Sequence, residues 1–135
     1  MLPDMGDDVH LLAFCAVLAW VMVMTAATLK TRWWGPRGLR VALSNRDAVP
    51  EASPLAGRAD RAARNMLENL LIFVALVAAA RLAGVNSARI TPGATVFFWA
   101  RLLYFPVYLG GVTVLRTALW AVGVVGMAMI FATLL

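Results

Sequence analysis

A group of charged and amide side chains lies just before an apolar segment in the middle of the chain. Arg61, Asn65 and Glu68 are spaced i, i+4 and i+7, so they share one stripe of a helix, and Arg64 flanks that stripe. Guanidinium groups bind carboxylates through paired hydrogen bonds, a glutamate accepts from an ammonium group, and an asparagine offers both a donor and an acceptor. These residue types suit a ligand that carries carboxylates and an amine, as a peptide-like zwitterion does.

A second polar stripe follows in the next apolar segment. Arg101, Tyr104 and Tyr108 are spaced i, i+3 and i+7, and Arg101 interrupts a run that is otherwise uncharged. An arginine in the middle of a lipid-facing helix costs at least about 2.5–3.5 kcal/mol, so such residues normally face protein or a wet cavity. We therefore expect the two stripes to face each other.

Each of these residues taken singly also has a structural interpretation. Arg64 and Glu68 could form an intrahelical pair, Arg61 could extend to lipid headgroups, and Tyr104 and Tyr108 could belong to the aromatic belt at the membrane surface. Anchoring alone does not account for paired stripes on two helices, so we favour a binding site.

Composition predicts that the stripes are carried by membrane-spanning helices. The chain has 135 residues, of which 62% are hydrophobic and 14% charged, and its mean hydropathy of +0.81 excludes an ordinary water-soluble domain. The segments 11–29 and 117–135 each contain 19 residues without a charge, enough to cross a hydrocarbon core of about 30 Å as helix. The residues before the first segment are acidic, so we expect that segment to be retained rather than cleaved as a signal peptide.

We predict an all-α integral membrane four-helix bundle, one domain over residues 1–135. The expected helices are 9–29, 60–83, 93–113 and 115–134, the last two forming a tight hairpin. Turn residues, among them Gly35-Pro36 and Ser53-Pro54, forbid a continuous helix over the connection 30–59, which we expect to be a polar loop. Six of the 12 basic residues lie in this connection, which places it in the cytoplasm and both termini outside: Lys30, Arg32, Arg37, Arg40, Arg46 and Arg58.

Other chemistry has little support in the sequence. Cys15 and His10 are the single members of their types, so neither an intramolecular disulfide nor a metal site is expected. Neither a phosphate-binding glycine motif nor a serine-hydrolase turn is present, and nucleic acid is the least favoured partner for the net charge of +5. Gly123 and Gly126 are interpreted as close-packing positions between helices.

Two motifs resemble one known family. Arg61-Ala-Ala-Arg64-Asn65-Met-Leu-Glu68 is similar to the second-helix signature R-A-x-x-N-x-x-E of the MAPEG family, membrane-associated proteins in eicosanoid and glutathione metabolism. Ala100-Arg101-Leu-Leu-Tyr104-Phe-Pro-Val-Tyr108 resembles the family's third-helix segment A-R-x-x-Y/H-x-x-x-Y. The resemblance covers nearly the whole chain and points to the bacterial-type members that are like microsomal glutathione transferase, in an inner (plasma) membrane.

The resemblance implies a homotrimer that binds glutathione as co-substrate between neighbouring subunits, near the cytoplasmic ends of the helices, without a metal. The implied glutathione-binding residues are Arg61, Arg64, Asn65, Glu68, Arg101, Tyr104, Tyr108 and either Arg32 or Lys30. The implied catalytic residues are Arg116, which would face the thiol, and Tyr108, with Thr117 as another hydrogen-bond donor. The other partners implied are a lipophilic substrate and membrane lipid.

The activity expected from this resemblance is a glutathione transferase or peroxidase. An arginine beside the thiol would favour the thiolate, which would attack a lipophilic electrophile or a hydroperoxide. A non-catalytic protein of the same fold, with a binding or assembly role, is the alternative. A small drug exporter is disfavoured, because the first helix lacks the lone carboxylate expected of such a protein.

Overall fold

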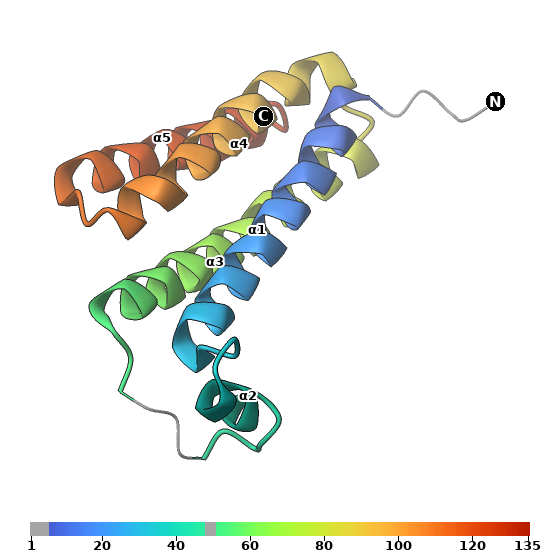
Figure 1. The fold of residues 1–135 in the computed structure, drawn as a ribbon. Coiled ribbons are helices and arrows are strands. Elements are labelled where there is room, and N and C mark those ends of the chain that lie inside the picture. Colours follow the sequence, from blue (N-terminus) through green and yellow to red (C-terminus); the bar gives the residue numbers. More distant parts are fainter. Residues whose placement is uncertain (1–5, 48–50) are drawn as a thin grey trace.

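The structure of the chain is a computed structural model that describes residues 6–47 and 51–135, and over these residues it is all-α (Figure 1). Its helices are α1 (Asp7–Thr31), α2 (Pro36–Ala42), α3 (Pro54–Leu82), α4 (Ser87–Leu109) and α5 (Thr113–Ala132). The all-α prediction is confirmed, and the described part of the chain has five helices rather than four.

Three helices are long and apolar enough to cross a membrane: α1, α3 and α5. The chain is therefore a multi-pass integral membrane protein. The helix α4 is not among these three, but it packs against all of them. This central position lets α4 carry polar side chains that face protein.

Two predicted boundaries are wrong for the same reason. Gly35-Pro36 and Ser53-Pro54 were interpreted as turns of the 30–59 connection, whereas they begin α2 and α3. Proline is favoured in the first turn of a helix, where its missing N–H has no partner to lose. At α3 the backbone N–H of Ala56 also donates to the Ser53 hydroxyl, at 3.2 Å. The connection is thus shorter than predicted and contains a helix.

The start of α4 is also earlier than predicted. The helix begins at Ser87 rather than at residue 93, with the Asn86 side chain accepting from the N–H of Ala88 at 2.9 Å. The predicted start at residue 93 would leave Pro92 before the helix, whereas Pro92 lies inside it. The α4–α5 connection is confirmed as a tight hairpin.

The helices associate as two pairs, α1 with α3 and α4 with α5 (Figure 1). The pairs meet near the N-terminal end of α1 and separate toward the other end. At the end where they meet, the buried carboxylate of Asp8 on α1 contacts Arg81 of α3, Nε to Oδ2 at 2.8 Å, and accepts from the Ser87 hydroxyl on α4. At the other end Arg58 of α3 donates to the carbonyl of Leu109, at 2.9 Å. Arg58 therefore belongs to a helix contact and not, as predicted, to a loop.

The α4–α5 pair is close because glycines lie where the helices cross. A Cβ built on Gly126 would be 2.7 Å from the Gly93 carbonyl oxygen, and one on Gly93 would be 2.7 Å from the Gly126 carbonyl oxygen. The interpretation of Gly126 as a packing position is confirmed. Backbone approach of this kind is a common basis of helix association in membranes.

We predict that Gly126→Ala lowers the thermal stability of the protein in detergent, because the added methyl group forces α5 away from α4 at a cost of about 1–3 kcal/mol. Gly110→Ala is the matched control, since a Cβ there has its nearest neighbour at 3.4 Å and no steric demand on another helix. Equal melting temperatures for the two variants would contradict the packing described.

Candidate functional site

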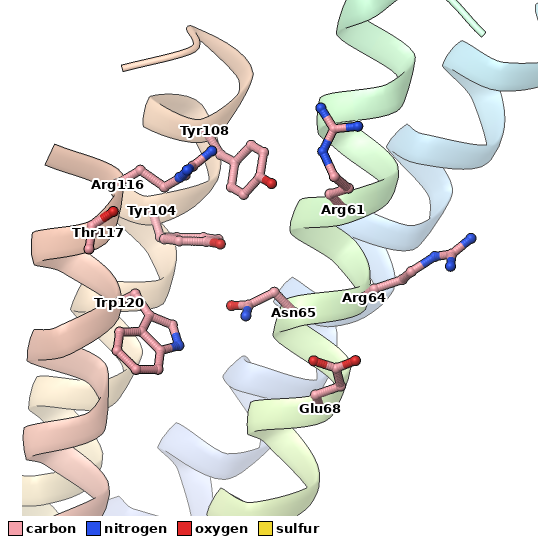
Figure 2. Close-up of a pocket in the computed structure, with 9 residues that line it drawn as sticks. All are labelled: Arg61, Arg64, Asn65, Glu68, Tyr104, Tyr108, Arg116, Thr117 and Trp120. Atoms are coloured by element: carbon pink, nitrogen blue, oxygen red, sulfur yellow. The ribbon is translucent and has the colours of Figure 1, made fainter. Parts of the chain in front are cut away.

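A cavity of about 380 Å³ opens between α3 and the α4–α5 hairpin (Figure 2). We call it the α3–α5 cleft. It is open on one side, and its walls combine charged, aromatic and hydroxyl side chains from three helices: Arg61, Arg64, Asn65, Glu68, Tyr104, Tyr108, Arg116, Thr117 and Trp120. Most of the residues predicted from the two stripes are therefore brought together.

On α3, one face packs into the core of the protein and another face lines the cleft. Ala62 and Met66 are fully buried in the core, so the face with Arg61, Asn65 and Glu68 turns outward to the cleft. Because residues three and four apart share one face of a helix, the burial of Ala62 and Met66 also determines the direction in which the polar stripe points.

Arg64 has a different environment from its neighbours on the stripe. Its guanidinium points away from the other cleft side chains in Figure 2 and lies 3.0 Å from Oδ2 of Asp60, in an exposed i, i+4 pair. The alternative interpretation of Arg64 and Glu68 as an intrahelical pair is wrong, because Arg64 pairs with Asp60 of the preceding turn instead. Arg64 therefore belongs to the rim of the cleft.

The opposite wall places a cation over an aromatic ring. Tyr104 and Tyr108 on α4 are buried and pack edge to face, with ring centroids 5.3 Å apart. Across the hairpin, the guanidinium carbon of Arg116 lies 4.6 Å from the Tyr108 ring centroid. Within residues 6–47 and 51–135, no carboxylate oxygen lies within 4.0 Å of Arg116. The cleft thus contains a guanidinium held by a π-face, a contact that leaves its charge uncompensated.

Arg101 is not a cleft-lining residue in this structure. Its side chain is completely buried behind the cleft, between the rings of Phe97 and Tyr104, each 5.3 Å from its guanidinium carbon. Its Nη1 donates to Oδ1 of Asn65 at 2.8 Å, whereas Nε and Nη2 have no hydrogen-bond partner among the described residues. Arg101 thus contacts one residue of the cleft, Asn65, and does not itself form the wall that was predicted.

Space for this guanidinium comes from α5. A Cβ at Gly123 would lie 3.2 Å from Nε of Arg101, so a side chain there would press on the buried cation. Gly123 was interpreted as a packing position, and the group that it packs against is Arg101.

The cations at the end of α1 lie elsewhere. Arg32 and Lys30 line a different cavity, beside α2, and neither lines the α3–α5 cleft within this chain. The buried Cys15 is also outside the cleft.

Trp120 lines the cleft and was missed as a site residue. It stands one helical turn beyond Arg116 and Thr117 on α5, and its side chain is 42% exposed. The i, i+4 spacing from Arg116 is the signal that could have identified it.

The Asn65–Arg101 bond leads to a prediction about stability. Asn65→Ala removes the partner of a fully buried guanidinium and should lower the free energy of unfolding by about 1–3 kcal/mol. Adding Arg101→Met to Asn65→Ala should recover part of this loss, since both polar partners are then absent. Thermal and denaturant unfolding of the two single variants and the double variant measure this coupling. Strictly additive effects would contradict it.

Comparison with known proteins agrees with the motifs on α3 and α4. A family model described as "MAPEG family" matches residues 9–135, which is nearly the whole chain. Comparison with curated proteins gives no match.

Proposed function

The chain belongs to the MAPEG family, whose membership implies a membrane enzyme of glutathione or eicosanoid metabolism, and on that premise we propose that it is a glutathione-dependent transferase or peroxidase. The observation that carries the proposal is the α3–α5 cleft. Its α3 wall has side chains that can bind the carboxylates and the ammonium group of a zwitterionic peptide, and its α5 wall has a guanidinium with an uncompensated charge. Within the family, the proposed type is the bacterial one that is like microsomal glutathione transferase.

The α3 wall supplies the contacts for the peptide part of glutathione. Arg61 binds a carboxylate and Glu68 accepts from the ammonium group. Because Oδ1 of Asn65 already accepts from Arg101, the Asn65 amide nitrogen remains to donate to a ligand oxygen in the cleft. Arg101 is thus a positioning residue.

The α4–α5 wall activates the thiol. A free thiol has a pKa near 8.5, so only a few per cent is ionised at neutral pH. Arg116 stabilises the thiolate by opposite charge, and the hydroxyls of Tyr108 or Thr117 donate hydrogen bonds to it. The thiol proton is released to solvent through the open side of the cleft.

The thiolate then reacts with a lipophilic partner that enters from the bilayer. In transfer, the sulfur lone pair forms a C–S bond, and the displaced electron pair leaves with a leaving group or takes up a proton. In peroxide reduction, the thiolate attacks one oxygen of the hydroperoxide and the O–O bond breaks. An alcohol and a glutathione sulfenic acid form, and a second glutathione converts the latter to disulfide and water. Neither route requires a metal.

We propose a homotrimer whose subunits complete each other's sites. The cleft is open, and Arg61 and Glu68 are exposed in the single chain, which is the arrangement expected of a site that a neighbouring subunit closes. A neighbour's helix end would then supply the cation proposed at position 32 or 30. The basic connection between α1 and α3 lies on the cytoplasmic side, and the membrane is the inner (plasma) membrane of a bacterium.

Ultraviolet difference spectra test thiol activation. Titration of glutathione into the purified protein at neutral pH should give a saturable thiolate band. Arg116→Ala should abolish the band, because it removes the cation, and Arg61→Ala should shift the titration to about tenfold higher glutathione, because it removes a charged hydrogen bond. Arg89→Ala, which removes an arginine outside the cleft, is the control and should leave the band unchanged.

Two other outcomes would replace this proposal. Glutathione binding detected by calorimetry, without a thiolate band, would favour a non-catalytic protein with a binding or assembly role. Absence of binding would mean that the chain shares the family's fold but not its ligand.

A further inference from the structure

Two side-chain hydrogen bonds join α3 to the α4–α5 hairpin in the part of the chain that the structure describes. One runs from Arg101 to Asn65, toward the middle of the bundle. The other runs from Nε of Arg58 on α3 to the carbonyl oxygen of Leu109, the last residue of α4, at 2.9 Å. Leu109 directly follows the cleft residue Tyr108, so the second bond crosses from α3 to the hairpin at the end where the helix pairs separate (Figure 1).

Arg58 contacts the turn between α4 and α5 in two ways. The last carbonyls of a helix have no partner within the helix and carry partial negative charge, so a cationic donor such as Arg58 is favoured at Leu109. The Arg58 side chain also lies along the turn, because a Cβ built on Gly111 would be 3.9 Å from its Cδ, Nε and Cζ. Arg58 therefore holds the short segment that separates Tyr108 from Arg116.

The position of the cleft cation follows the position of this turn. Arg116 lies in the first turn of α5, where its N–H donates to the Val112 carbonyl at 3.1 Å, and its guanidinium packs on the Tyr108 ring. Arg61 of α3 stands on the opposite wall at the same end of the cleft (Figure 2). A turn that moved away from α3 would carry Arg116 and Tyr108 away from Arg61 together.

Arg58 acts on this geometry from outside the cleft. It does not line the cleft, and among the described residues no carboxylate oxygen lies within 4.0 Å of it. Its effect on a bound ligand therefore passes through the position of the hairpin.

We propose that Arg58 is a positioning residue for thiol activation, an inference that rests on the proposed function of the cleft. With the peptide part of glutathione bound on α3, the bond to Leu109 keeps Arg116 beside the sulfur. Electrostatic attraction falls with distance, so a small outward movement of the hairpin lowers the fraction of bound thiolate. The contacts on α3 are retained, and ligand affinity changes little.

The test compares Arg58→Met with the wild-type protein in detergent. Methionine keeps much of the apolar stem along the turn but removes the hydrogen-bond donor. Ultraviolet difference spectra at saturating glutathione, recorded over a range of pH, give the pH at which half of the bound thiol is ionised. This midpoint should rise by about one pH unit in Arg58→Met, a tenfold smaller ionisation constant. The affinity for S-methyl glutathione, which binds without a thiol, should change less than about twofold.

Two control variants and one further measurement separate positioning from other effects. Arg58→Lys restores a donor within reach of the same carbonyl and should recover most of the midpoint shift. Arg40→Met removes an exposed arginine of α2 that does not line the cleft, and should leave the midpoint unchanged. Without ligand, backbone amides of residues 110–116 should exchange with deuterium faster in Arg58→Met than in the wild-type protein, because the turn is no longer held.

The same midpoint in Arg58→Met and wild type would overturn the inference even if amide exchange became faster, since Arg58 would then only stabilise the turn. Unchanged amide exchange would also overturn it, because the bond would not hold the hairpin. An equal midpoint shift in Arg40→Met would assign the effect to net charge. A wild-type protein without a thiolate band would instead contradict the proposed function, and this inference with it.

Discussion

The buried guanidinium of Arg101 is the polar group on which the arrangement of the helices around the cleft depends. A charge inside a membrane-spanning bundle has neither water nor lipid that can solvate it, so protein groups must surround it. Asn65 of α3 supplies the acceptor, the rings of Phe97 and Tyr104 supply π-faces, and Gly123 of α5 leaves the space. One side chain on α4 thus fixes how α3 and α5 stand relative to each other, and thereby the two walls of the cleft.

The other buried or interfacial charges divide between the two ends of the bundle. Where the helix pairs meet, Arg81 pairs with the Asp8 carboxylate, which also accepts a hydrogen bond from the Ser87 hydroxyl, so the buried carboxylate already has two polar partners. Where the pairs separate, Arg61, Arg116 and Arg37 have no carboxylate within 4.0 Å among the described residues. Ligand chemistry is therefore expected at the second end, in the α3–α5 cleft.

Much of this fold could be predicted from the sequence, because uncharged runs indicate which segments span the membrane and helical spacing indicates which residues share a face. The stripe from Arg61 to Glu68 was placed correctly for that reason. The helix starts at Pro36 and Pro54 were not predicted, since proline after glycine or serine is typical of both a turn and a first helical turn. Spacing also cannot say which neighbour a side chain meets, so the burial of Arg101 and the pairing of Arg64 with Asp60 required the structure.

The central claim is that the cleft binds glutathione as its thiolate, and the most direct test counts protons released on binding. Calorimetry at neutral pH in buffers of different ionisation enthalpy gives this number, with S-methyl glutathione, which has no thiol proton, as the reference. If Arg116 stabilises the thiolate, binding should release close to one proton per glutathione, since a free thiol is almost fully protonated at this pH, and the reference should release none. Binding of glutathione with no more proton release than the reference would contradict the account.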